Sequence, residues 1–149
     1  MKIEELLKTK EMPEAKKLVL NIIVTANYLS EKLAEILKPF EISSQQFNVL
    51  RILRGQKGKP ANLSTIQERM VTKMSNTTRL VDKLVEKNLC ERIVCPSNRR
   101  KVEIRITFKG LELLRKLDPL VEDHEQGIAS KINEKEILLL NTQLNELRN

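Results

Sequence analysis

The spacing of apolar residues changes along this chain, and the change limits the folds that it can adopt. In the first part of the chain apolar residues recur at the spacing of amphipathic helices, whereas Val102, Ile104 and Ile106 alternate with polar residues as in a half-buried strand. Leu89–Cys95 is a second run with high strand propensity. We therefore expect helices followed by a β-hairpin, whose turn Pro96–Arg100 carries two arginines at its tip.

Six helices are expected around this hairpin. The first runs from Pro13 to about Lys38, the second from Ser43–Gln46 to Gly55, and the third, a short one, from Asn62 or Ser64 to Met70. The fourth opens after Val71 and Thr72, and its apolar face consists of Met74, Leu80, Val81, Leu84 and Val85. The fifth is capped by Thr107 and kinked or interrupted by Pro119, and the last begins at Asn133. Ser43 and Gln46 form a capping box. The two short helices, with a break of three to four residues between them, are a candidate helix-turn-helix.

The order of elements predicts a mainly α fold with a small β-hairpin wing, which is a winged helix-turn-helix with additional terminal helices. We expect one domain over residues 1–149, with a DNA-binding lobe at about 42–109 and dimerisation helices at about 1–38 and 110–149. The terminal helices carry more aliphatic surface than such a lobe needs for its own core. A homodimer is therefore expected.

Positive charge is concentrated in the middle of the chain. The formal net charge is +7, and residues 51–109 contain 15 basic and 5 acidic side chains. A polyanion such as nucleic acid or anionic lipid is the favoured partner, and net charge alone does not choose between these two. A merely solvated basic face is the alternative. The acidic start Met1–Glu5 does not resemble a signal peptide, and the longest aliphatic run, Ile137–Leu140, is far too short to span a membrane. We expect a cytoplasmic protein without a membrane partner.

Small polar and basic residues lie opposite the apolar face of the second short helix, and more basic residues lie at the hairpin. Ser, Thr, Asn and Arg are suited to phosphates and base edges, and arginines beside the helix can reach phosphates or an adjacent minor groove. The candidate contacts with double-stranded DNA are Ser75, Asn76, Thr77, Arg79, Lys83, Arg99, Arg100 and Lys101. A solvated helix face and an ordinary basic loop are the alternatives.

Four segments resemble the MarR (multiple antibiotic resistance regulator) family in their order and spacing. Ser44–Leu50 is similar to the start of that family's second helix, Ser75–Leu84 to its recognition helix, Glu86–Leu89 to its exit into the wing, and Ile106–Gly110 to its return from the wing. The chain departs from the family at Asn98, where Asp is usual, and at Asn88, where Gly is common. Asn88 tolerates a left-handed backbone and can still cap the helix, but Asn98 cannot form the charged pair that would orient a wing arginine.

The resemblance implies a transcriptional regulator, most often a repressor. It implies that the recognition helix enters the major groove, that Arg79 contacts a base or a phosphate, and that Arg100 probes the minor groove. Terminal helices from two chains would interleave, and the operator would be an inverted repeat with major grooves about 10 base pairs apart. It also implies a response to a small aromatic or amphipathic anion. Tyr28, Phe40 and Phe47 are the candidates for that cleft, with a place in the core as the alternative.

Functions of other classes are less well supported. His124, the single histidine, lies among acidic residues, and no catalytic triad, metal-ligand cluster or glycine-rich phosphate loop accompanies it, so we expect no enzyme and no cofactor or metal. Cys90 and Cys95 are expected on opposite faces of a strand, which disfavours a mutual disulfide and leaves redox sensing open. The hairpin lacks the stacking aromatics of RNA-binding modules and an exposed apolar face for membranes. A winged helix that binds protein rather than DNA is the main alternative.

Overall fold

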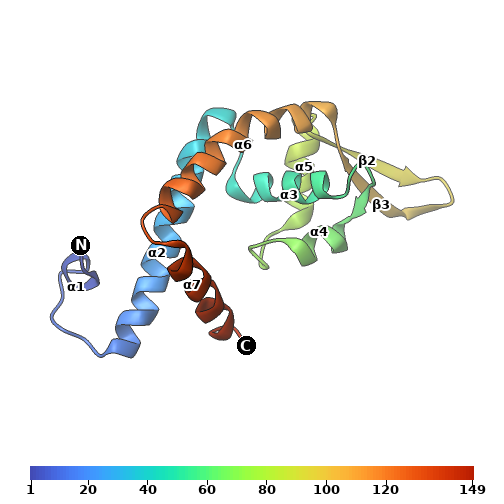
Figure 1. The fold of residues 1–149 in the computed structure, drawn as a ribbon. Helices are drawn as coiled ribbons and strands as arrows, with labels where there is room; N and C mark the ends of the chain where they lie inside the picture. Colours follow the sequence, from blue (N-terminus) through green and yellow to red (C-terminus); the bar gives the residue numbers. More distant parts are fainter.

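The computed structural model describes residues 1–149, except for the side chain of Arg99. The fold is mostly helical, with one small antiparallel sheet (Figure 1). In chain order the elements are α1 (Ile3–Leu6), α2 (Glu14–Leu37), the 3-10 turn η1 (Lys38–Phe40), α3 (Ser44–Gly55), β1 (Ala61–Asn62), α4 (Leu63–Arg69), α5 (Thr77–Glu86), β2 (Cys90–Cys95), β3 (Asn98–Ile106), α6 (Phe108–Ala129) and α7 (Glu134–Glu146). The predicted fold class, mainly α with a small β-hairpin, is confirmed.

Side-chain caps determine where several of the helices begin. The Ser43 hydroxyl accepts a hydrogen bond from Gln46 N at 3.1 Å, and the Gln46 side chain accepts one from Ser43 N at 3.0 Å, so the predicted capping box is present. The Thr107 hydroxyl caps α6 by accepting a hydrogen bond from Gly110 N, and Asn133 forms a second capping box with Glu136 at the start of α7. Helix α6 is continuous through Pro119 and changes direction along its length (Figure 1). Pro119 therefore does not interrupt it.

The sheet has the strand order β1-β3-β2. Strand β3 pairs with β2 along one edge, beginning where Cys90 lies opposite Ile106. Along its other edge β3 pairs with β1, where Ala61 lies opposite Ile104. The short strand β1 was not predicted, because two residues cannot show an alternating pattern. It forms only because β3 provides hydrogen-bonding groups along that edge.

The hydrophobic core lies between α3, α4, α5, the sheet and the first two thirds of α6. Its fully buried members include Leu50, Leu53, Ile66, Met70, Val81, Leu84, Ile104, Leu114 and Leu117. Val81 and Leu84 belong to the apolar face predicted for the second short helix, and Leu80 and Val85 of the same face pack against this core. This core fixes α5 and the hairpin relative to each other.

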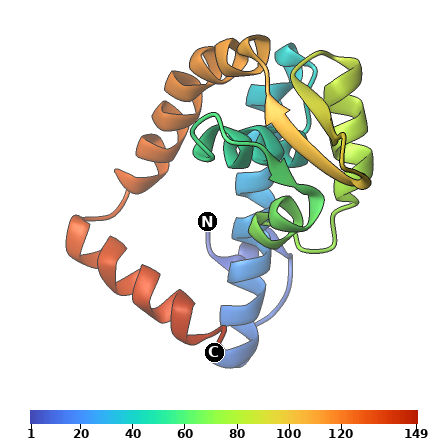
Figure 2. The same cartoon turned by 90° about the vertical axis from the view of Figure 1, so that its right-hand side faces the viewer.

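The terminal helices extend away from this core (Figure 2). Helix α7 buries none of its side chains, and the N-terminal half of α2 also exposes a row of aliphatic residues. Together they line an apolar groove of about 790 Å³, bordered by Leu18, Ile22, Leu29, Leu140, Leu144 and Leu147. A single copy of the chain therefore leaves a large apolar surface uncovered. Within the described chain, no helix is both long and apolar enough to cross a membrane.

Candidate nucleic-acid interface

Helix α5 begins at Thr77, later than the sequence pattern predicted. Asn76 is its N-cap, and the Asn76 side-chain oxygen accepts a hydrogen bond from Arg79 N at 3.1 Å. Residues 70–76 connect α4 to α5. The expectation of a helix that opens directly after Thr72, with a break of only three to four residues, is therefore wrong, because the Asn76 cap sets a later start.

Two amide side chains hold this connection in place. Gln67 on α4 donates a hydrogen bond to the Lys73 carbonyl, and its side-chain oxygen accepts one from the Thr77 hydroxyl. Asn48 on α3 accepts a hydrogen bond from Val71 N at 2.9 Å. Neither role was expected from the sequence, because the partners are separated by up to 23 residues. These contacts tie the connection and the start of α5 to α3 and α4.

The residues of α5 divide into a buried face and an exposed face. Val81 and Leu84 are fully buried, and Thr77, which lies four residues before Val81, is only 6% exposed. Thr77 was expected to contact DNA, and this expectation is wrong because its hydroxyl is bonded inside the lobe to Gln67. Thr78 is exposed instead. Because residues four apart share one face of a helix, the spacing from the apolar Val81 could have predicted that Thr77, and not Thr78, is buried.

Arg79 and Lys83 lie on the exposed face of α5. Lys83 forms an ion pair of 3.3 Å with Glu86 one turn later. The structure gives the Arg79 guanidinium no ion pair within the described part of the chain. Ser75 and Asn76 lie just before the helix, where the Ser75 hydroxyl donates to the Thr72 carbonyl at 2.6 Å. The expected stripe is thus a helix face extended by the preceding turn.

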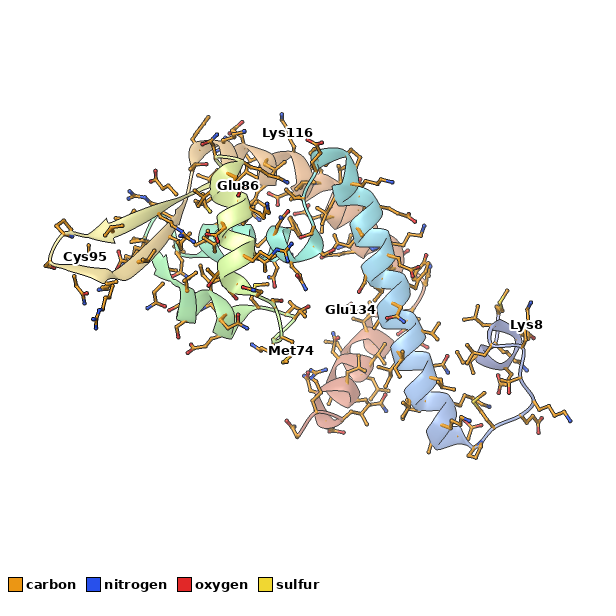
Figure 3. The ribbon with its side chains drawn as sticks, turned by 180° about the vertical axis from the view of Figure 1, so that it is seen from behind. Lys8, Met74, Glu86, Cys95, Lys116 and Glu134 are labelled. Atoms are coloured by element: carbon orange, nitrogen blue, oxygen red, sulfur yellow. The ribbon has the colours of Figure 1, made fainter. Side chains whose placement is uncertain are left out.

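Met74 was expected in the core and is instead 95% exposed. It lies in the connection before α5 and points away from the lobe (Figure 3). Val71, in the same connection, is also exposed. The helical spacing that assigned Met74 to the apolar face does not apply, because the helix has not yet begun there. Two exposed apolar side chains therefore adjoin the polar start of α5.

The hairpin turn is tighter than expected. Its tip is Pro96–Ser97, and strand β3 already begins at Asn98, so the arginines lie on the strand rather than in the turn. Cys95 pairs with Asn98, whereas Val94 pairs with Val102. Residues 99–101 therefore form a bulge without opposing residues on β2. The three basic residues Arg99–Lys101, which were predicted at the tip of the hairpin, therefore lie in this bulge and not in the regularly paired part of the strand.

The residues of the bulge differ in their surroundings. Arg100 is exposed, and its guanidinium has no ion pair in the described part of the chain. The Lys101 ammonium lies 3.5 Å from the Glu103 carboxylate on the same strand. The side chain of Arg99, also expected to contact DNA, lies outside the described residues.

An ion pair joins α5 to the hairpin. The Arg92 guanidinium on β2 donates a hydrogen bond to the Asp82 carboxylate on α5, and both side chains are partly exposed. Arg105 on β3 pairs with Glu91 across the hairpin at 3.2 Å. Neither contact was expected from the sequence. They orient the exposed face of α5 and the bulge relative to each other.

Comparison with known proteins identifies the family. The model of the MarR family matches residues 42–102. The crystal structure of a MarR transcription factor from Planctomyces limnophilus is 30% identical in sequence, covers 93% of this chain and 99% of its own, and superimposes with a TM-score of 0.68. The chain belongs to the MarR family. This is a family of transcription regulators rather than of enzymes.

Two further proteins resemble this MarR-family protein. One is the HTH-type transcriptional regulator PecS of Dickeya dadantii, to which this chain is 26% identical over 113 residues. The match covers 72% of this chain and 66% of the length of PecS. A cysteine-to-serine mutant of E. coli MarR in complex with operator DNA is 24% identical, with a TM-score of 0.78 and coverage of 90% of this chain and 95% of its own. The second comparison supports the fold.

The two departures from the family pattern have structural consequences. Asn88 has φ of 58°, so it occupies the left-handed conformation after α5 that was predicted for it. The Asn98 side-chain oxygen accepts a hydrogen bond from Arg100 N at 3.1 Å. Asn98 thus contacts the backbone of the wing arginine. The side chain therefore fixes the backbone of this MarR-family wing at the bulge, although it cannot form a charged pair with the guanidinium.

The three aromatic candidates for a ligand cleft do not share one cavity. Phe47 is 3% exposed and lies in the core beside a small cavity of about 160 Å³. Tyr28 is 45% exposed on α2 and lines neither that cavity nor the one at Phe40. Phe40 is half-buried and lines a separate cavity of about 410 Å³. A ligand site shared by all three residues is therefore not formed by this chain alone.

The two cysteines differ in their environments, as their spacing predicted. Cys90 is buried, and burial raises the pKa of its thiol to about 12. Cys95 lies near the hairpin tip (Figure 3), where a hydrogen bond with the Ser97 hydroxyl lowers the pKa of its thiol. Both thiols are free. Within the described residues, no cluster of three or more His, Cys, Asp or Glu side chains is arranged to hold a metal ion.

Proposed function

We propose that this MarR-family protein is a sequence-specific regulator that binds double-stranded DNA as a homodimer and represses transcription. The observation that carries the proposal is the pair of exposed guanidinium groups, Arg79 on α5 and Arg100 at the wing bulge, neither of which has an ion-pair partner in the described chain. An arginine near a helix start is suited to guanine in the major groove, and an arginine on a wing is suited to the narrower minor groove.

The candidate DNA surface follows from side chains that are exposed or, for Ser75, partly exposed. On and before α5 it consists of Ser75, Asn76, Thr78, Arg79 and Lys83, and on the wing it consists of Arg100 and Lys101, with Arg99 kept as a candidate from the sequence. Asn76 contributes through the helix cap, because its side-chain oxygen is already engaged. Met74 extends the surface with an apolar group suited to a thymine methyl. Thr77 is not part of it.

The homodimer would be formed by the terminal helices. The apolar groove between α2 and α7 leaves aliphatic side chains exposed that a second copy can cover. In this proposal residues 42–109 form the DNA-binding lobe, and residues 1–38 and 110–149 form the dimer. Two α5 helices would then reach successive major grooves of an inverted repeat. Sedimentation at micromolar concentration should give a dimer, and a monomer there would contradict this part of the proposal.

The test is fluorescence anisotropy with DNA duplexes selected from random sequence, compared with scrambled duplexes at near-physiological salt. We expect the selected duplex to be preferred by about 10³-fold or more. Arg79→Ala should cost about 1–3 kcal/mol of binding free energy on the selected duplex and far less on the scrambled one. The matched control is Arg115→Ala, which removes an exposed arginine from α6, outside the proposed surface.

The main alternative is a winged helix that binds another protein. That function predicts no selected duplex and equal, weak binding of both duplexes by the wild type and Arg79→Ala. A reporter gene under the selected operator separates repression from activation, because loss of Arg79 should raise expression if the protein is a repressor and lower it if it is an activator.

A further inference from the structure

The connection between α4 and α5 inverts the usual placement of polar and apolar side chains. Met74 is 95% exposed and points away from the lobe (Figure 3), and Val71 is 85% exposed. Two polar side chains of the same segment are engaged instead, because the Lys73 ammonium and the Ser75 hydroxyl each donate a hydrogen bond to a backbone carbonyl. Single exposed apolar residues are common, but two in one segment beside engaged polar neighbours indicate a contact surface.

The backbone that carries this apolar pair is held in place. The Asn48 side chain accepts a hydrogen bond from Val71 N at 2.9 Å, and the Gln67 side chain donates one to the Lys73 carbonyl. The N-cap of α5 follows two residues after Met74. Both ends of the segment are therefore anchored, so that less conformational entropy is lost when its exposed side chains bind another molecule.

The surroundings of the pair favour DNA as that molecule. Residues 71–79 carry two positive charges, Lys73 and Arg79, and no negative charge. The pair is also continuous with the exposed face of α5 that we place in the major groove. The apolar group that the major groove presents is the C5 methyl of thymine, which apolar side chains contact. The flexible thioether of Met74 can adapt its shape to such a methyl group.

We propose that Met74, supported by Val71, contacts a thymine methyl and so adds a thymine to the bases that the operator must contain. This inference rests on the proposed function. The chain from Met74 to Arg79 spans at most about 12 Å, because three of its steps are helical and two precede the helix. Since base pairs are spaced by about 3.4 Å, the thymine lies within about four base pairs of the guanine that Arg79 contacts.

Replacement of thymine by deoxyuridine tests this contact, because uracil differs from thymine only in lacking the methyl group. Each thymine of the selected operator is replaced in turn, and affinity is measured by fluorescence anisotropy. We expect a loss of about fourfold per half-site, the factor for one buried methyl group, within about four base pairs of the guanine. That guanine is the position at which Arg79→Ala relaxes the base preference. The absence of thymine there, or a uracil without effect, would overturn the proposal.

Substitutions at position 74 assign the effect to this side chain. Met74→Gln keeps the length but not the apolar end, so affinity for the thymine operator should fall to that for the uracil operator, which should itself change little. Met74→Leu stays apolar and should keep most of the uracil effect. Because Met74 is exposed, neither variant should change the free energy of unfolding. An equal loss on both operators with Met74→Gln would show that the contact is not with the methyl group.

Phe108→Gln is the matched control. Phe108 is 74% exposed at the start of α6. This position is near the other end of α5, because the Lys109 ammonium donates a hydrogen bond to the Lys87 carbonyl at 2.9 Å. The variant removes an exposed apolar side chain outside the proposed surface, so both affinities should stay at their wild-type values. The same loss in this control would mean that exposed apolar groups raise DNA affinity without regard to their position.

NMR of the methionine methyl groups gives a direct readout of the contact. The protein is labelled with ¹³C at these methyl groups, and the Met74 signal is assigned by its loss in Met74→Leu. The thymine operator should shift this signal, and uracil at the contacted position should reverse most of the shift. Met70, which is 1% exposed, is the internal reference and should respond equally to both operators. An equal response of Met74 to both operators would contradict the contact.

The proposed function and this inference can be separated by their outcomes. If no duplex is selected from random sequence, both are wrong. If a duplex is selected and Arg79→Ala weakens its binding, but Met74→Gln and the uracil substitutions have no effect, only the inference is wrong. A changed sedimentation of Met74→Gln in the absence of DNA, together with unchanged operator binding, would assign the apolar pair to a protein contact instead.

Discussion

Arg54 on α3 and Asp118 on α6 form a two-point ion pair, with nitrogen–oxygen distances of 2.7 and 3.0 Å. Both side chains are about one third exposed, and the partners are 64 residues apart in the chain. The pair joins the first helix of the DNA-binding lobe to the long helix that leads toward the proposed dimer. A planar guanidinium bound at two points also restricts the rotation of α3 against α6.

A double-mutant cycle with Arg54→Ala and Asp118→Ala should therefore reveal a coupling of about 1 kcal/mol in the free energy of unfolding, allowing for solvent screening. Urea unfolding at one fixed protomer concentration measures it, because dimerisation makes stability depend on concentration. The control cycle uses Arg115 and Glu112, an exposed pair within α6 for which about 0.3–0.5 kcal/mol is expected. Equal coupling energies in the two cycles would mean that the Arg54–Asp118 pair stabilises the fold no more than an exposed ion pair within one helix.

The two glycines of α6 should respond to alanine in opposite directions. A Cβ at Gly110 would lie 2.2 Å from the Leu89 carbonyl oxygen and 2.7 Å from Ile106 Cγ1, whereas a Cβ at Gly127 would meet nothing within 4 Å. Gly110→Ala should therefore destabilise the protein by about 1–3 kcal/mol, and Gly127→Ala should stabilise it by up to about 1 kcal/mol. Thermal and urea unfolding check both values. A neutral Gly110→Ala would indicate that the start of α6 can move away from Leu89 and Ile106.

Thr77 and Thr78 offer an isosteric test of which threonine faces DNA. Thr77→Val removes the hydroxyl that donates to Gln67, so the free energy of unfolding should fall by about 1–2 kcal/mol. Thr78→Val changes an exposed residue and should alter stability by less than about 0.5 kcal/mol while weakening operator binding. Unfolding and anisotropy are measured on both variants. The reverse outcome, with Thr77→Val affecting only DNA binding, would contradict the burial of Thr77.

Local signals in the sequence predicted much of this fold. The capping residues Ser43, Thr107 and Asn133 act on backbone groups three residues away, so their spacing can be recognised without a structure. The alternation at Val102–Ile106 likewise predicted the second strand of the hairpin, because one face of that strand packs on the core.

Contacts between distant residues could not be predicted in this way. The true start of α5, and with it the exposure of Met74, depends on Gln67 and Asn48 holding the preceding connection. The bulge at residues 99–101 depends on the register between two strands, which the composition of the turn does not determine. The candidate site was therefore found in the right elements, but its individual side chains needed the structure.

Cys95 should be alkylated at lower pH than an ordinary cysteine, because the Ser97 hydroxyl stabilises its thiolate and lowers its pKa below the usual value of 9.0. Below pH 9 the thiolate fraction, and hence the rate with iodoacetamide, should exceed that of a free thiol. Ser97→Ala should move the midpoint of the rate profile upward. Cys90 is the internal control: burial raises its pKa to about 12, so its peptide should stay unmodified until the protein unfolds. Mass spectrometry of the two peptides measures both rates in one sample, and equal profiles for wild type and Ser97→Ala would rule out the hydroxyl as the cause.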